Sequence, residues 1–139
     1  MKNYRIIMES LSNAPLEEVE VPELKPDQVL IRNFYTIVSA GTERAWSMDM
    51  PNAHSTFPCM PGYCGAGEVV KVGDRVMVNR AGHQLYSVKD EKLVANGKIK
   101  ASMILSEIVS PQRGHEIYRM LAEEKNPSLG IAFDWTTLA

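Results

Sequence analysis

The chain has 139 residues, of which 45% are hydrophobic and 23% charged, and its formal net charge is -2. This length and composition predict one soluble globular domain, and the near-neutral charge gives no reason to expect a nucleic acid or an anionic membrane as a partner. The sequence contains no apolar run of the roughly 20 residues that a membrane span needs. Residues 1–11 also lack a signal-peptide core. A cytoplasmic location is therefore expected.

The N-terminal part of the chain predicts strands separated by turns. Residues 4–8 are β-capable, and the sequence Asn-Ala-Pro at 13–15 marks a turn. Residues 16–21 alternate apolar side chains with glutamates, which is the period of a half-buried strand. Residues 28–39 form the longest stretch of β-branched and aromatic residues in the protein. This stretch predicts a long central strand.

The middle of the chain predicts an irregular segment followed by more short strands. Residues 40–57 contain glycine, proline and small polar residues, and we expect them to be irregular apart from one helical turn near 43–48. Four further strands are predicted, at residues 67–70, 75–78, 85–88 and 92–94. A bend at Gly73-Asp74 separates the first two of these. The first 95 residues thus predict a mainly antiparallel barrel or sandwich.

The C-terminal part changes to helical character after Asn96-Gly97. Ser110 can accept a backbone hydrogen bond as an N-cap, and Pro111 suits the first helical position. The apolar stripe of the predicted helix consists of Ile117, Met120 and Leu121. Lys-Asn-Pro at 125–127 ends the helix, and residues 129–133 predict a final strand. One helix and one strand cannot fold alone, so this part is expected to pack on the β unit.

The stretch PGYCGAGEVV, residues 61–70, has the glycine content of a phosphate-binding loop but not its order. A dinucleotide fingerprint reads G-x-G-x-x-G between a strand and a helix. Here Gly62, Gly65 and Gly67 read G-x-x-G-x-G, and the residues that follow have strand character. The stretch therefore predicts glycines that let two backbone segments approach closely. No cofactor-binding residue is assigned.

Several motifs together carry a resemblance to a known family. LEEVEVPELKPDQVLIRN, GTE at 41–43, PGYCGAGEVV and KVGDRVMV occur in that order, and residues 97–139 follow as a tail. They resemble the GroES-like catalytic domain of the medium-chain (zinc-type) alcohol dehydrogenase/reductase superfamily, and the tail resembles the segment that returns to this domain. The resemblance implies a mainly β fold with α: a partly open barrel of antiparallel strands plus a C-terminal amphipathic helix and strand. It also implies a single domain over residues 1–139, built from segments 1–95 and 97–139. The Rossmann nucleotide-binding domain of the family is absent near residues 94–97.

The residues that would hold the catalytic metal in this family are substituted. The cysteine ligand falls on Ala40 and the histidine ligand on Tyr63, while a neighbouring glutamate becomes Cys64. Alanine offers no ligand atom, and a phenol is a poor zinc ligand. The cysteines of the structural zinc lobe are missing as well. We therefore expect neither catalytic nor structural zinc.

What remains of the family's site predicts a vestigial pocket with Thr42, Glu43, Tyr63 and Cys64 as its candidate catalytic residues. The resemblance places a substrate-binding hydroxyl at Thr42 and a carboxylate that orients the metal-bound histidine at Glu43. Tyr63 could instead donate a phenolic hydrogen bond to Glu43. Each residue also has a simpler interpretation: local capping for Thr42 and Glu43, space filling for Tyr63 and packing for Cys64.

The function implied by the resemblance is that of an NAD(P)-dependent oxidoreductase acting on small alcohols or aldehydes. Hydride transfer needs a nicotinamide held against the substrate. A chain without the nucleotide-binding domain, whether by natural truncation or by engineered deletion, is therefore not expected to catalyse it alone. Two alternatives stay open. The chain could be a binding or self-assembly module that uses the uncovered domain interface, or one part of a split oxidoreductase whose nucleotide-binding domain lies on another chain.

Overall fold

The computed structural model describes residues 1–51, 53, 55–70, 75–79, 81–90, 94–96, 107–123 and 130–138. In these residues the chain forms a two-stranded sheet, a seven-stranded sheet and two α-helices. The elements are β1 (Lys2–Ile6), β2 (Leu16–Glu20), β3 (Gln28–Val38), α1 (Ala40–Ser47), β4 (Cys64–Val69), β5 (Arg75–Asn79), β6 (Tyr86–Asp90), β7 (Val94–Asn96), β8 (Glu107–Val109), α2 (Gly114–Glu123) and β9 (Ile131–Asp134). Short 3-10 helices, η3 (Pro111–Arg113) and η4 (Trp135–Leu138), precede α2 and follow β9.

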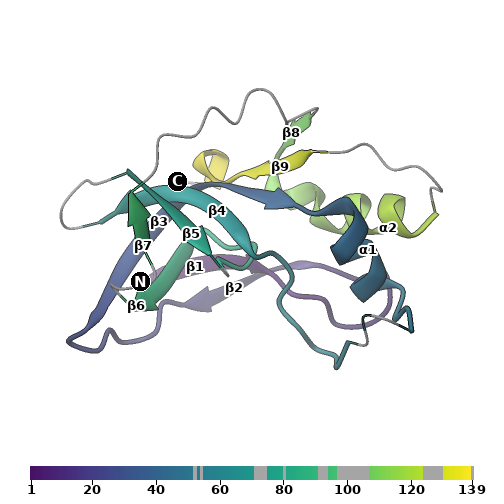
Figure 1. Cartoon of the computed structure of the whole chain (residues 1–139), viewed down its shortest axis with the longest axis horizontal. Coiled ribbons are helices and arrows are strands. Elements are labelled where there is room, and N and C mark those ends of the chain that lie inside the picture. The colour runs from purple at the N-terminus through teal and green to yellow at the C-terminus, as the bar shows by residue number, and fades with distance from the viewer. Residues whose placement is uncertain are drawn as a thin grey trace.

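The long strand β3 organises the larger sheet, as the sequence predicts. It pairs antiparallel with β4 along one edge. Along its other edge it pairs first with β6 and then with β9. The strand order is β7-β5-β4-β3-β9-β8, with β6 beside β3 off this path. A strand from the C-terminal part of the chain therefore lies next to the central strand of the N-terminal part (Figure 1).

The fold class predicted from the sequence is confirmed. The described part of the chain is mainly β, and its strands do not close into a barrel. The amphipathic helix is present as α2, and the Ser110 side chain accepts a hydrogen bond from the Gln112 N–H at its start. One pairing differs from the antiparallel pattern, because β8 runs parallel to β9. Strand β8 has only three residues, which is too short for its alternation to be recognised.

The segment after β3 is more regular than predicted. Residues 40–47 form helix α1, whereas the sequence indicated an irregular stretch with one turn near 43–48. Ser39 has extended dihedral angles at the N-cap position, and its backbone N–H donates to Glu43 Oε1 at 3.0 Å. This side chain satisfies a donor that would otherwise be unpaired at the helix start. The bond stabilises a helix in spite of Gly41.

The glycine-rich stretch forms β4 and its approach, not a phosphate-binding loop. A Cβ atom on Gly67 would lie 2.3 Å from the carbonyl oxygen of Arg32 on β3. Only glycine therefore fits at this point of the β3–β4 pair. The prediction that these glycines allow close backbone approach is confirmed.

The main hydrophobic core lies between the larger sheet and the chain segments that cover one of its faces. Its buried members come from both ends of the chain: Ile6, Met8, Ala14, Val38, Ala40, Leu85, Val109, Ile117, Tyr118, Leu121, Ile131, Phe133 and Trp135. Of the predicted stripe, Ile117 and Leu121 are buried and Met120 is partly buried against them. Helices α1 and α2 lie side by side at one end of the molecule (Figure 1). The terminal helix and strand are thus part of this core.

Some sequence predictions fall outside the described residues: the bend at Gly73-Asp74, the start of the strand at 92–94, the helix stop at 125–127, Leu129 and the proposed junction at Gly97. Within the described part of the chain, no helix is long and apolar enough to cross a membrane.

Candidate functional site

A fully buried polar network lies behind helix α1. It consists of Thr36, Glu43, His83, Tyr118 and Trp135, and we call it the Glu43 network. None of these five side chains has any exposed surface. They come from β3, α1, the loop before β6, α2 and η4 respectively. Polar groups at such depth are stable only when they are hydrogen-bonded.

The carboxylate of Glu43 is the centre of this network. Its Oε2 atom lies 2.9 Å from His83 Nε2 and accepts a hydrogen bond from the Tyr118 hydroxyl. Its Oε1 atom accepts the Ser39 N–H. Three groups thus bind one carboxylate, and its position in the first turn of α1 adds the favourable end of the helix dipole. This arrangement compensates a buried negative charge that would otherwise be costly.

The opposite side of the His83 ring leads to a hydroxyl group. Nδ1 lies 2.8 Å from Thr36 Oγ1, and the indole N–H of Trp135 donates to the same oxygen at 2.8 Å. Phe133 packs edge-on against the imidazole, with ring centroids 5.0 Å apart. The imidazole is therefore fixed on both nitrogens and packed against an aromatic ring.

Burial and the nearby carboxylate change the acidity of the surrounding groups. The pKa of Tyr118 is raised well above its usual value, because burial and the negative charge of Glu43 both disfavour the phenolate. Burial raises the pKa of the Cys64 thiol, and Glu43 raises it further. The pKa of Cys59 is raised by burial. Neither thiol has the lowered pKa of a reactive cysteine.

The order carboxylate–imidazole–hydroxyl in Glu43, His83 and Thr36 is that of a hydrolase triad. Here, however, all three side chains have 0% exposure, and the hydroxyl oxygen already accepts the Trp135 N–H. A substrate carbonyl therefore cannot reach Thr36. The arrangement joins elements of the fold and does not provide a nucleophile.

The four candidate residues from the sequence lie near one another but on two sides of α1. Glu43 points into the core, whereas Thr42 is exposed. Tyr63 is half-buried and packs edge-on against Trp46, with ring centroids 6.4 Å apart. Thr42 and Trp46 are four residues apart on the helix and so share a face. Cys64 is half-buried at the start of β4.

The proposed hydrogen bond from Tyr63 to Glu43 is not found. Glu43 does accept a phenolic hydrogen bond, but the donor is Tyr118. It also orients a histidine, and this residue is His83. No local pattern in the sequence points to His83, because its partners are 40 and 47 residues away in the chain. Tyr118 does have a local signal: it follows Ile117 on the buried face of α2, and a buried phenol needs a hydrogen-bond partner.

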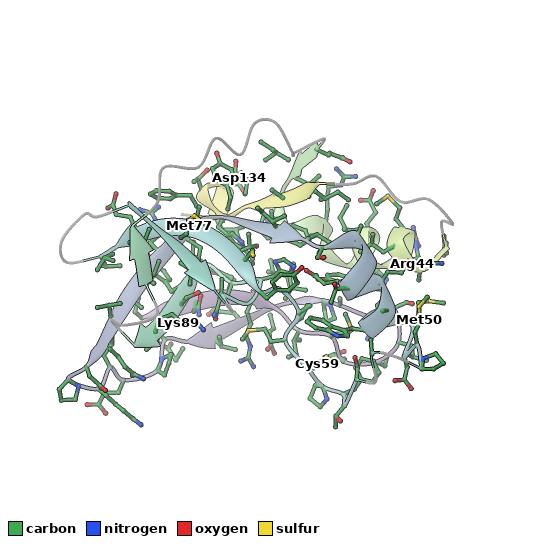
Figure 2. The ribbon with its side chains drawn as sticks, in the orientation of Figure 1. Arg44, Met50, Cys59, Met77, Lys89 and Asp134 are labelled. Carbon is green, nitrogen blue, oxygen red and sulfur yellow. The ribbon has the colours of Figure 1, made fainter. Side chains whose placement is uncertain are left out.

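A further hydrogen bond connects the two helices that carry this network. Arg44, which follows Glu43 on α1, donates from Nε to the carbonyl oxygen of Leu121 on α2 at 2.8 Å. Figure 2 shows the Arg44 side chain at the end of the molecule where the two helices meet. The bond occupies a carbonyl in the last turn of α2. The α1–α2 contact is thus polar at its edge as well as in the core.

The residues at the family's metal position do not fit a zinc ion. Ala40 has no donor atom, and both carboxylate oxygens of Glu43 are engaged within the protein. Among the residues that the structure describes, no group of three or more His, Cys, Asp or Glu side chains could hold a metal. The glycine-rich stretch likewise does not fit a dinucleotide phosphate. A Cβ atom on Gly62 would lie 2.8 Å from atoms of His83, so its open side faces the protein.

Comparisons with known proteins agree with the fold. No family model matches the chain. Sorbitol dehydrogenase of Bombyx mori is 32% identical over 92 residues, which cover 60% of this chain and 24% of that protein. The chloroplastic NADPH-dependent alkenal/one oxidoreductase of Arabidopsis thaliana is 34% identical over 80 residues, or 58% of this chain and 21% of that protein. The chain thus spans less than a quarter of the length of these curated relatives.

Solved structures extend the likeness to the C-terminal part. A putative zinc-binding dehydrogenase from Sinorhizobium meliloti, bound to NADP, aligns with 88% of this chain and 52% of its own, at a TM-score of 0.55 and 13% identity. A putative NADPH:quinone reductase from Bacillus thuringiensis aligns with 73% of this chain and 34% of its own, at a TM-score of 0.60 and 18% identity. Together with the strand order, these matches show that the chain has a fold of the medium-chain dehydrogenase/reductase superfamily.

Proposed function

We propose that this chain is the substrate-side domain of a medium-chain oxidoreductase that works without a catalytic zinc. The observation that supports this proposal is that the fold is retained while the residues at the family's metal-ligand positions are substituted. Ala40 and Tyr63 stand at the positions of the family's cysteine and histidine ligands. Glu43, which would orient the ligand histidine, is instead saturated by partners from the core.

The proposed substrate is a small alcohol or aldehyde held by the exposed face of α1 and the residues that precede β4. Thr42 offers a hydroxyl there, and Trp46 and Tyr63 form an aromatic corner beside it. Cys64 adds a neutral thiol, since its pKa is raised. The proposal includes neither a nucleic acid nor a membrane as partner, and it places the protein in the cytoplasm.

The metal part of the proposal is tested by removing metals. We expect purified protein, dialysed against a chelator, to contain zinc far below one equivalent, and its melting temperature to stay unchanged. The reason is that Ala40 and the engaged carboxylate of Glu43 leave too few ligands for the tetrahedral site that zinc requires. Elemental analysis and thermal unfolding measure the two quantities, with a zinc-dependent dehydrogenase treated in parallel as the control. Stoichiometric zinc that survives dialysis would contradict the proposal.

We further propose that the chain does not transfer hydride alone, since the nicotinamide must be supplied by a nucleotide-binding domain. Titration calorimetry with NADH and NADPH should show no binding to this chain. If the protein is one part of a split enzyme, binding and oxidoreductase activity should both appear when a chain with a nucleotide-binding domain is added. Binding of NADPH by this chain alone would exclude both versions of the proposal.

A second candidate, self-association, is supported by apolar side chains on the larger sheet. Ile108 on β8 is 54% exposed and Tyr35 on β3 is 36% exposed, and both strands are neighbours of β9. Exposed apolar groups on strands that flank the same neighbour favour association. Analytical ultracentrifugation of the wild type and of Ile108→Lys tests this candidate. A monomer at high concentration in both proteins would reject it.

A further inference from the structure

The donors and acceptors of the Glu43 network determine which nitrogen of His83 carries the proton. The Trp135 indole can only donate, so Thr36 Oγ1 must accept from it. The hydroxyl hydrogen of Thr36 then has one acceptor among its hydrogen-bonded partners, the Nδ1 atom of His83. Nδ1 must therefore carry a lone pair, and the ring proton must be on Nε2, where it faces the Glu43 carboxylate. With this assignment every polar hydrogen in the network has an acceptor.

The backbone of His83 holds the loop that carries two of the candidate site residues. The His83 N–H donates to the carbonyl oxygen of Pro61 at 2.9 Å, and the Gly82 N–H donates to that of Gly62 at 3.1 Å. Gly62 has a φ of +92° and lies directly against the imidazole, where a Cβ atom would be only 2.8 Å from Cγ and Nδ1. Pro61 and Gly62, which lead into Tyr63 and Cys64, thus contact His83 through its backbone and its ring.

The ring of His83 is in turn held by residues from the C-terminal part of the chain. Tyr118 on α2 shares the Glu43 carboxylate with Nε2. Trp135 on η4 binds the hydroxyl that faces Nδ1. Phe133 on β9 packs against the imidazole in a T-shaped arrangement. Because each contact is direct and the region is fully buried, a shift of the C-terminal segment must displace the ring or break these bonds.

We propose that His83 is a positioning residue: as a neutral imidazole protonated on Nε2, it couples the docking of the C-terminal segment to the loop of residues 61–63, which carries Tyr63 and leads directly into Cys64, the first residue of β4. The carboxylate of Glu43 fixes the ring, and the ring fixes the loop. Docking of α2 and η4 thereby sets the position of Tyr63 against Trp46. This role does not depend on the substrate or on the proposed oxidoreductase activity.

The tautomer is tested by nitrogen NMR of the histidine rings in the full chain at pH 8. We expect His83 to show a proton on Nε2 and a lone pair on Nδ1. His115, which is exposed on α2, gives the reference for a solvated ring in the same spectrum. A proton on Nδ1 of His83 would overturn the assignment and with it the proposal.

The coupling is tested by the labelling rate of Cys64 with a thiol reagent, measured in a Cys59→Ser background. Tyr118→Phe removes one hydrogen bond to the carboxylate and keeps the ring, so we expect labelling of Cys64 to become about tenfold faster through local opening of the loop. Tyr4→Phe is the matched control, because it removes a phenol whose bond to Glu18 lies on the surface. It should leave the rate unchanged.

Urea distinguishes local opening from global loss of stability. Labelling through global unfolding accelerates with urea, whereas labelling through local opening does so only weakly. We expect the increase in Tyr118→Phe at zero urea to be insensitive to small additions of urea, and Trp135→Phe to behave in the same way. The proposal is refuted if Tyr118→Phe labels Cys64 as slowly as Tyr4→Phe, or if its increase follows urea throughout.

Two substitutions at His83 distinguish the effect of its hydrogen bonds from the effect of its packing volume. Glutamine offers a donor group at one position and an acceptor group at the other, as the two nitrogens of the neutral imidazole do, while leucine offers neither. We expect His83→Gln to protect Cys64 better than His83→Leu does. Equal protection in the two variants would show that the ring acts only by packing, and would reject the positioning role.

Discussion

Two groups of carboxylates in this molecule have opposite relations to solvent. On the two-stranded sheet, Glu17 and Glu18 of β2 pair with Arg5 and Lys2 of β1, and Glu20 pairs with the N-terminal amine of Met1, all at the surface. Glu43 of α1 has 0% exposure and is held by an imidazole, a phenol and a backbone N–H. The surface pairs can exchange their partner for water at little cost, whereas Glu43 cannot. The comparison teaches that the stability of this fold depends on one buried carboxylate far more than on several exposed ones.

The largest expected effect is that of Glu43→Ala. It leaves the Tyr118 hydroxyl and the His83 Nε2–H buried without an acceptor and removes the side chain that accepts the Ser39 N–H. We expect a loss of about 3–5 kcal/mol of unfolding free energy, because two buried donors lose their acceptor at about 1–3 kcal/mol each and the start of α1 loses a hydrogen bond. Urea unfolding followed by circular dichroism measures it. Glu17→Ala is the matched control, and an equal loss in both variants would contradict the comparison.

The second-largest loss of stability is expected for Gly62→Ala, which tests the contact between Gly62 and the His83 ring. Gly62 has a φ of +92°, and a Cβ atom there would lie 2.8 Å from the His83 ring. We expect a loss of about 1–3 kcal/mol, because a non-glycine residue is strained in this backbone region and the imidazole must also move. Chemical unfolding measures the loss. Gly41→Ala is the control, because a Cβ atom at Gly41 meets nothing within 4 Å.

Alkaline pH should weaken the stabilisation that Tyr118 gives to the Glu43 network, and leave the surface ion pairs less affected. The pKa of Tyr118 in the folded protein is raised above its ordinary value of 10.0, so the folded state retains this proton more strongly than the unfolded state does. The contribution of the Tyr118 hydroxyl to the free energy of unfolding is therefore complete below the pKa of the unfolded state. It is lost as pH rises from there toward the pKa of the folded state. We expect the stability difference between wild type and Tyr118→Phe to shrink above about pH 10.

Thermal unfolding of the two proteins across that alkaline range provides the measurement. Tyr4→Phe serves as a second reference: the pKa of Tyr4 is also raised, but by its contacts with Glu18 at the surface. A constant difference between wild type and Tyr118→Phe at every pH would show that the phenol of Tyr118 does not titrate in this way.

The smallest expected effect is that of Arg5→Ala, which breaks the ion pair between Arg5 and Glu17 on the exposed sheet. About a third of each side chain's surface is accessible, at 36%. We expect a loss below about 1 kcal/mol that fades as salt is added, because solvent and ions screen such pairs. Urea unfolding at low and high ionic strength checks this. A large loss of unfolding free energy that persists in high salt would mean that the surface ion pairs stabilise the fold as strongly as the buried Glu43 does.

The strands and the C-terminal helix could be predicted from the sequence because their signals are local. β3 follows from a run of β-branched and aromatic residues, and the start of the last helix from Ser110 and Pro111. Helix α1 was underestimated, since the bond that stabilises its start joins Ser39 to a side chain four residues later across a glycine. Strand β8 was missed because three residues show no period.

The candidate site was predictable only in part. The resemblance pointed to Glu43, and Glu43 proves to be the centre of a network. Its partners could not be read from the sequence, because the Tyr118 hydroxyl comes from 75 residues away and no spacing rule connects the two. The expectation of Tyr63 as the donor was reasonable from the family's motif. That expectation is wrong because the fully buried hydroxyl of Tyr118 donates to Glu43 in place of Tyr63.

The separation between partners has a consequence for synthesis of the protein. Thr36 is made early, but its indole partner Trp135 follows 99 residues later. Until β9 and Trp135 have left the ribosome, Thr36 lacks its indole partner and the sheet lacks β9 beside β3. Folding of such distant contacts is slow, and exposed strand edges favour aggregation in the meantime. A nascent chain of this protein should therefore be prone to aggregation until residues 131–135 have been made.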